Sequence, residues 1–452
     1  MNDDDTSTHA NYGCLDGYVV LDLTHYLAGP LCTKILAALG ATVIKLEPTE
    51  HGDGSRLQPP FVGASGFVYE RIDDRLVGLT YLKRNQGKKS VSIDLKVEQG
   101  QHILRRLVER TDVVVHNFRA GVAERLGVDE KSLRQIKPNI VYLEINGYGP
   151  YAESGKDPGA VDILIQAFSG IMGHSGFPDG PPIRCAAPIA DEAAALFATI
   201  SILAGLIRRD AARGDGQAAQ YSVSLLGSLS ALFWDEQVDI YAAMGLPHRN
   251  GNTTPRIAPF NAYRTSDSKY VAVAAVSERE WGALVTAVGD DRLAKTEWKT
   301  LPCRIRDRAA IDTLLSDWVS RKTRDAVCAH LTSFGVPAVP VNTVDDLLSD
   351  TRMVSRMLCP VEDPNFGPTP AYEARFPIVE NGRQLTQTGR AAPRLGADTR
   401  DVLTQMCGFT ETEVDHMLAS GVVRETPPPP QAAAAPSTAA PDLPSHRSSE
   451  NG

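Results

Sequence analysis

The sequence has no glycine-rich nucleotide-binding fingerprint and no closely spaced cysteine pair, and each absence excludes a kind of site. The segment Thr24–Pro30, which follows the first apolar run, reads THYLAGP and lacks the GxGxxG pattern of a dinucleotide site. The 7 cysteines lie far apart without a CxxC pair. We therefore expect reduced thiols, and neither a disulfide framework nor a zinc site.

The chain also lacks a basic stripe, a targeting leader and a long apolar run. Its formal net charge is -9 and its pI is about 5.6, which argues against a nucleic-acid partner. The first residues are acidic, without the basic and apolar regions of a secretory signal or the arginines of a mitochondrial one. No apolar run in the sequence reaches membrane-spanning length. These features predict a cytoplasmic protein without a membrane partner.

What is present is enough apolar sequence for a large core. At 452 residues and 42% apolar content, the chain should hold two or more domains. The two ends are different in composition. Residues 1–14 are expected to form a flexible arm, and the Pro/Ala/Ser-rich residues 426–452 a disordered tail.

A βαβ unit opens the ordered part of the chain. Short apolar runs at Tyr18–Leu23 and Thr42–Glu47 flank a segment with helical spacing, which predicts a parallel sheet with a right-handed crossover. Ligands of such sheets bind at the carboxyl ends of the strands. The loops that begin at Thr24, Pro48 and Asn117 follow strands, so they are candidates for the wall of a ligand site.

The stretch Gly170–Asp191 holds two acids, Asp179 and Asp191, in a Gly/Pro-rich frame. The turn Pro178–Pro182 would fix the direction of the Asp179 carboxylate, as a nucleophile or base requires. The same residue types make ordinary surface turns. The local sequence leaves both readings open.

Further motifs follow one another in a fixed order: LDLTHYLAGP, LGATVIKLEP, NQGKKSVSIDL, NFRAGVAERLG, SGIMGHSGFPDGPPIR, APIAD and PFNAYRTSDSKYVAVAA. Their order and spacing resemble the class III CoA-transferase family, also called the formyl-CoA transferase/L-carnitine dehydratase family, from about Gly17 to Val423. The resemblance implies an α/β fold with a Rossmann-like large domain built from both chain ends, a smaller α/β domain, and an interlocked homodimer. The corresponding divisions are 15–225 and 336–425 for the large domain and 226–335 for the small domain with its linkers.

The resemblance also implies the chemistry. Coenzyme A would move from an acyl-CoA thioester to a free carboxylic acid, a small mono- or dicarboxylate, with no metal or permanently bound cofactor. Asp179 would attack the acyl-CoA to form an anhydride and then an aspartyl-CoA thioester. Backbone N–H groups at Asn250, Gly251 and Asn252, or at residues 173–176, suit stabilisation of the oxyanion.

Matching positions suggest which residues contact coenzyme A. The expected wall consists of Tyr26, Leu27, Ala28, Asn117 and Phe118, with Lys88, Lys89 and Arg125 at the phosphates. The lysine pair could equally be a solvated turn, and Phe118 a core residue. Pro48 and Asn146 replace cationic contacts of formyl-CoA transferases, so those contacts must be weaker or supplied elsewhere.

A second carboxylate on the substrate would need a cation. Arg249, Arg256 and Arg184 are candidates for a bidentate contact, and surface ion pairing is the alternative for each.

Two other functions remain to be weighed. Alpha-methylacyl-CoA racemases resemble the chain at Asp191, but Val161 stands where they carry a histidine, and valine cannot transfer a proton. His174 is a weak substitute. Asp191 would then be a structural acid that caps the helix beginning at Glu192. A non-catalytic CoA-thioester binding protein is the third possibility, and an oriented Asp179 carboxylate argues against it.

Overall fold

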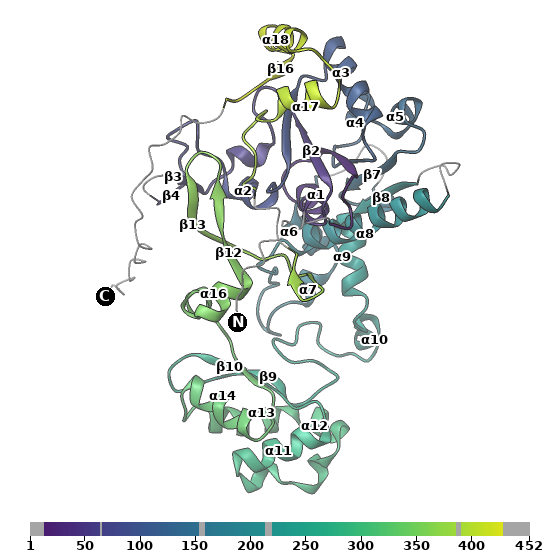
Figure 1. The fold of residues 1–452 in the computed structure, drawn as a ribbon. Helices are drawn as coiled ribbons and strands as arrows, with labels where there is room; N and C mark the ends of the chain where they lie inside the picture. The colour runs from purple at the N-terminus through teal and green to yellow at the C-terminus, as the bar shows by residue number, and fades with distance from the viewer. Residues whose placement is uncertain (1–12, 64–65, 153–158, 213–218, 386–389, 428–452) are drawn as a thin grey trace.

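The computed structural model describes residues 13–63, 66–152, 159–212, 219–385 and 390–427 (Figure 1). Most of the expected N-terminal arm and nearly all of the expected tail lie outside these ranges.

A seven-stranded sheet forms the centre of the large domain, in the order β16-β5-β2-β1-β6-β7-β8. Its strands are β1 (Val19–Leu23), β2 (Thr42–Glu47), β5 (Lys89–Ile93), β6 (Val113–His116), β7 (Val141–Asn146), β8 (Gln220–Ser224) and β16 (Val423–Arg424). All neighbours are parallel except β16, which runs antiparallel to β5 and brings the C-terminal part of the chain into the sheet. The first two strands lie where the apolar runs predict them.

Side chains alternate between two cores, one on each face of the sheet. Val20 of β1 packs with α1 (Ala28–Ala38) and the long helix α8 (Ile189–Ala211). Leu21, the next residue, packs on the opposite face. That face is covered by α3 (Glu98–Glu109), α5 (Glu130–Ile136), α17 (Thr399–Gln405) and α18 (Glu411–Ala419).

The strand order changes direction between β1 and β6. The chain first builds outward from β1 through β2 to β5, and then crosses back to place β6, β7 and β8 on the other side of β1. Ligands of open α/β sheets bind at such a switch point. The loops after β1 and β6 therefore meet at the edge where a ligand is expected.

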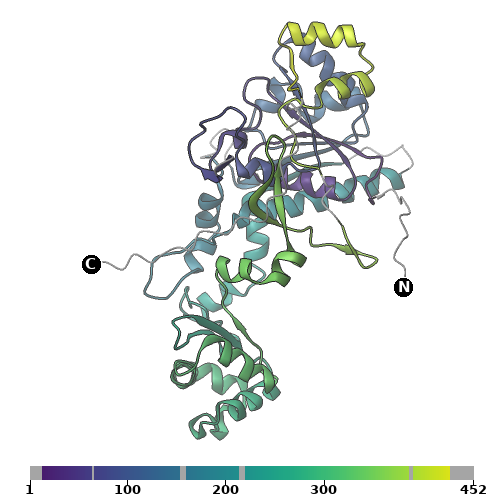
Figure 2. The same cartoon turned by 60° about the vertical axis from the view of Figure 1, so that its left-hand side comes forward.

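A second body lies away from the large sheet (Figures 1 and 2). Its sheet consists of β9 (Phe260–Arg264), β10 (Tyr270–Ala274) and β11 (Ala338–Pro340). The helices α11 (Glu278–Val288), α12 (Leu301–Arg306), α13 (Arg308–Val319) and α14 (Arg324–Ser333) pack with it around a separate core. β11 pairs with β10, so this body continues past the expected boundary at residue 335.

Shorter elements complete the chain. Between β2 and β5 lie η1 (Gly54–Leu57), the hairpin β3 (Phe61–Gly63) and β4 (Gly66–Val68), and α2 (Leu79–Arg84). α4 (Val122–Arg125) follows β6 on the face of the sheet opposite to α8. α6 (Asp162–Phe168) and α9 (Leu225–Phe233) pack against α8, while α7 (Ile171–His174) follows α6 and α10 (Val238–Ala243) follows α9. After β11 come α15 (Val344–Ser349), α16 (Thr351–Met357) and the hairpin of β12 (Leu358–Asp363) and β13 (Gly367–Ala374).

α8 is the one described helix that is long and apolar enough to cross a membrane, by length and composition alone. The sequence analysis did not anticipate a run of that length. In the fold, half of the apolar window of α8 is buried, and the helix packs against α1, α9 and β7. These contacts are those of a core helix.

Candidate active site

Asp191 lies in the first turn of α8, where the beginning of that helix meets the beginning of α1. The backbone N–H of Ala28, the first residue of α1, favours the ionised form of the Asp191 carboxyl group. Ala28 directly follows the loop after β1. Asp191 therefore lies near the end of the loop that the sheet topology marks as a ligand wall.

The Asp191 carboxyl is strongly perturbed. Burial is the largest cause and raises its pKa, and the negative charges of Asp162 and Glu192 act in the same direction. The Arg84 guanidinium and the Ala28 N–H oppose this effect, and the resulting pKa is about 7. A partly buried carboxylate whose pKa is raised this far is a candidate catalytic group.

Asp191 does not cap its helix, contrary to the expectation from sequence. α8 begins at Ile189 with Pro188 at the N-cap, and no side chain caps it. Asp162 fills the equivalent role, because its carboxylate accepts the N–H of Ala190 at 2.9 Å. The Asp191 side chain is thereby left free of a capping role.

A buried ion pair between Lys45 and Asp53 holds the loop after β1 in place. Lys45 of β2 donates to the Thr24 carbonyl at 2.7 Å and pairs with Asp53 at 3.0 Å, and both side chains are fully buried. The other Asp53 oxygen accepts the Tyr26 N–H at 3.1 Å. Burial alone would raise the pKa of Asp53, but Lys45 holds it well below its usual value. One ion pair thus holds both ends of Thr24–Tyr26.

The loops after β1 and β6 are joined directly. Asn117 accepts the His25 N–H and donates to the His25 carbonyl, each at 2.8 Å. Phe118 packs beside His25. Tyr26 is half exposed with a φ of 69°, a conformation that favours glycine, so its hydrogen bonds must hold it there. Gly29 lies so close to Thr24 that an added Cβ would approach its side chain to 2.3 Å.

Lys88 is not placed to contact a phosphate. Its ammonium is buried and donates to Asp22 at 2.9 Å, to the Pro30 carbonyl at 2.9 Å and to Asn85 at 2.8 Å. All three donors of the ammonium are in use. Lys88 therefore supports the loop and α1 from within, and the expected phosphate contact is not supported.

Asp179 lies on an exposed turn. Arg249 holds this turn by donating to the carbonyls of Phe177, Pro178 and Gly180. The Gly251 N–H is used as well, because it donates to the Gly176 carbonyl at 2.9 Å. The structure thus brings the 249–252 loop to the Asp179 turn, with Nε and Nη2 of Arg249 and the Gly251 N–H already used within the protein.

The remaining expected residues are dispersed. Arg256 pairs with Glu236 at 2.8 Å on the surface. Arg184 donates to the carbonyls of Cys185 and Ala186. Exposed positions are occupied by Arg125 and Asn252, and partly buried ones by Leu27, Lys89 and Asn250.

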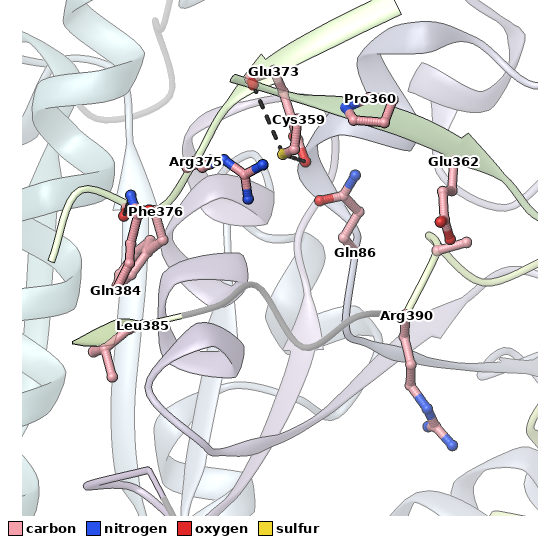
Figure 3. Close-up of a pocket in the computed structure, with 11 residues that line it drawn as sticks. Gln86, Cys359, Pro360, Glu362, Glu373, Arg375, Phe376, Gln384, Leu385 and Arg390 are labelled. Carbon is pink, nitrogen blue, oxygen red and sulfur yellow. Dashed lines mark hydrogen bonds between the residues drawn. The ribbon is translucent and has the colours of Figure 1, made fainter. Parts of the chain in front are cut away.

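Two cavities bear differently on the expected site residues. One of about 330 Å³ lies at the β12–β13 hairpin, where Arg375 points toward Cys359 and Gln86 while Arg390 points away (Figure 3). It contains none of the expected site residues. The other, about 570 Å³, lies between α7, α9, α10 and the following loop, and Asn250, Gly251 and Arg256 line it.

Three residues near the site were not expected from the sequence: Arg84, Lys45 and Asp53. A lysine inside the apolar strand TVIKLE is a detectable signal, since an unpaired lysine is rarely buried. Arg84 ends a short helix next to Lys83, where basic residues are common, and offers no comparable signal.

The fold and this carboxylate define an α/β enzyme with a Rossmann-like sheet. The chain belongs to CoA-transferase family III, which it matches over residues 15–399. It is a class III CoA-transferase.

Several characterised relatives match nearly the whole chain. A succinyl-CoA--D-citramalate CoA-transferase of Chloroflexus aurantiacus is 31% identical, over 90% of this chain and 98% of the relative. A succinate--glutarate CoA-transferase of Agrobacterium fabrum is 30% identical, over 87% and 95%. A crystal structure of a CAIB/BAIF family protein from Brucella suis superposes with a TM-score of 0.72 at 32% identity, over 87% of this chain and all of that one.

Proposed function

We propose that this enzyme transfers coenzyme A from an acyl-CoA to a small dicarboxylic acid, with Asp191 as the nucleophile. The observation that carries the proposal is the partly buried Asp191 carboxyl group at the beginning of α8, near the start of α1, with its pKa raised mainly by burial. The names of the relatives, which act on succinate, glutarate and citramalate, support the class of acceptor.

The proposed reaction proceeds in two balanced halves. The Asp191 carboxylate attacks the acyl-CoA carbonyl, forms a mixed anhydride and releases the CoA thiolate. The thiolate attacks the aspartyl carbonyl, which gives an aspartyl-CoA thioester and frees the first carboxylate. The acceptor carboxylate then attacks this thioester, which forms a second mixed anhydride and releases the CoA thiolate. The thiolate attacks the acyl carbon of the acceptor, so that the new acyl-CoA forms and the Asp191 carboxylate is restored. No proton or external cofactor is required.

Asp191 is favoured over Asp179 for a physical reason. A carboxylate is a weak nucleophile in water, and loss of solvation together with fixed positioning strengthens it. Asp191 is partly buried in the first turn of α8, and its raised pKa reflects this loss of solvation. Asp179 is exposed on its turn, and no hydrogen bond to its side chain occurs among the described residues.

The coenzyme A wall is proposed to be the joined pair of loops after β1 and β6. Tyr26, Leu27, Ala28, Asn117 and Phe118 belong to it, with Arg125 and Lys89 near enough in sequence to serve the phosphates. All seven cysteines are free, and we place the enzyme in the reducing cytoplasm on that ground.

We further propose that two chains form the interlocked homodimer implied by the family. Large apolar side chains are exposed on four helices that lie together: Ile163, Leu164 and Phe168 on α6, Leu196, Ile200 and Ile207 on α8, Leu232 on α9 and Ile240 on α10. A monomer rarely leaves so much apolar surface to water.

The test compares two isosteric substitutions. Asp191→Asn should lower kcat for transfer from succinyl-CoA to glutarate by at least about 10³-fold, the scale of losing a covalent nucleophile. Asp179→Asn serves as the matched control and should retain activity within about tenfold. Loss of activity in Asp179→Asn alone would contradict the assignment.

A further inference from the structure

Arg84 is a partly buried arginine without an ion-pair partner. It is the last residue of α2, and burial lowers its pKa. Within the described part of the chain, its guanidinium makes no hydrogen bond and no ion pair within 4 Å. A guanidinium carries five N–H donors, and buried arginines are normally paired. Arg84 therefore has donors available in a partly desolvated place.

The backbone on both sides of Arg84 is fixed. The Lys83 carbonyl accepts from the Lys34 ammonium of α1 at 2.5 Å. Asn85 accepts from Lys88 at 2.8 Å and donates to the Tyr81 carbonyl at 3.1 Å. These contacts set the end of α2 against α1, so Arg84 has little freedom except in its own side chain.

Arg84 and Asp191 both adjoin the beginning of α1. The Lys88 ammonium joins Asn85, the neighbour of Arg84, to the Pro30 carbonyl. Ala190, the neighbour of Asp191, packs in one core cluster with Ala28.

The acids whose charges act on Arg84 are Asp191, Glu192 and Asp53, in that order. Asp53 is already paired with Lys45, and Asp191 interacts with Ala28. If the reacting carboxyl group of a dicarboxylate lies at Asp191, its second carboxylate would therefore lie near the positive charge of Arg84.

We propose that Arg84 binds the distal carboxylate of the dicarboxylic substrate and is the residue that selects dicarboxylates over monocarboxylates. This inference rests on the proposed function. A planar guanidinium binds a carboxylate through two parallel hydrogen bonds, which gives direction as well as attraction. Held this way, the substrate presents its other carboxyl group to Asp191.

The experiment compares acceptors of equal length that differ in one carboxylate. For the wild type, kcat/KM is measured for glutarate and for pentanoate with succinyl-CoA as donor. Because donor and acceptor react in separate halves, kcat/KM for the acceptor reports only its own half. Arg84→Gln should lower the glutarate-to-pentanoate ratio by about 10- to 100-fold, the effect of losing a charge-assisted pair. Arg84→Lys, which keeps the charge without the fork, should give an intermediate ratio.

Lys83→Gln is the matched control, since Lys83 adjoins Arg84 but its charge acts toward Glu373. The glutarate-to-pentanoate ratio of Lys83→Gln should equal that of the wild type. A fall in the Arg84→Gln ratio smaller than about tenfold would overturn the inference. An equal fall of kcat/KM for glutarate and pentanoate, together with a shifted pH profile, would mean that Arg84 acts on the pKa of Asp191. That result would also overturn the inference. A wild type that uses pentanoate as well as glutarate would overturn it while leaving the transferase function intact. Absence of any transfer would overturn both.

Discussion

At the scale of single residues, the main feature is the balance of charges on Asp191. Burial, Asp162 and Glu192 disfavour its ionised form, while Arg84 and the Ala28 N–H favour it. A desolvated carboxylate reacts better once ionised, but it is ionised over a narrower pH range. The same groups that strengthen the nucleophile thus set its pH dependence.

The pH profile follows from this balance. The pKa of Asp191 is raised from 3.8 to about 7, so the reactive carboxylate disappears as the pH falls below that value. We expect kcat/KM for acyl-CoA to rise about tenfold per pH unit below neutrality and to level off above it. Initial rates between pH 5 and 9 would measure this, with Asp179→Asn as a control that shows the same profile. A rate independent of pH down to pH 5 would disagree with the assignment.

At the scale of elements, the loop after β1 is held by groups from three directions. Lys45 holds Thr24, Asn117 holds His25, and Asp53 holds Tyr26. None of these contacts comes from the loop itself. The position of Ala28, and with it the donor to Asp191, therefore depends on side chains of the neighbouring segments.

Removal of Lys45 should separate this positioning from general stability. Lys45→Met leaves the buried Asp53 charge without its partner, and we expect the free energy of unfolding to fall by about 3–5 kcal/mol. Because the loop loses its anchor, KM for acyl-CoA should rise as well. Urea unfolding and steady-state kinetics measure the two effects.

Arg209→Met is the control for this prediction. Arg209 pairs with Asp112 at 2.9 Å at the other end of α8, away from the loop. This variant should lose stability without a change in KM. A Lys45→Met enzyme that folds with the KM of the wild type would refute the positioning role.

Local pattern was enough to predict much of the fold. The β1–α1–β2 unit and the meeting of the loops after β1 and β6 follow from apolar spacing and from the rules of parallel sheets. Where a local feature intervenes, the prediction fails. The apolar spacing of Val122–Leu133 favours one helix, but Gly127, with a φ of 65°, separates α4 from α5.

The chemistry was harder to predict because it arises from contacts distant in sequence. Asp179 stood out because of its rigid turn. Asp191 is perturbed by Ala28, Arg84 and Asp162, which only the folded chain brings near it. Lys88 looked like a phosphate contact in a basic turn, but Asp22, 66 positions earlier, takes up its charge. Burial and charge pairing decide such roles, and neither can be read from a local motif.

At the scale of the whole molecule, the exposed apolar side chains on α6, α8, α9 and α10 predict a dimer. Sedimentation equilibrium should give twice the chain mass of 48.8 kDa. Ile200, with 59% of its side chain exposed, lies within this surface. Ile200→Glu should weaken the dimer, because it places a charge in an apolar interface. Val97→Glu, at the exposed start of α3, is the control. A wild-type monomer at micromolar concentration would contradict the dimer.

The central claim is that Asp191 carries the covalent intermediate. Trypsin separates the two candidate acids, since Asp179 falls in the peptide 157–184 and Asp191 in the peptide 185–208. Enzyme incubated with succinyl-CoA would be treated with hydroxylamine, which converts an activated aspartyl group to a hydroxamate, and then digested and sequenced by tandem mass spectrometry. We predict a hydroxamate at Asp191, absent without substrate and in Asp191→Asn. A hydroxamate at Asp179, with peptide 185–208 unmodified, would contradict the account.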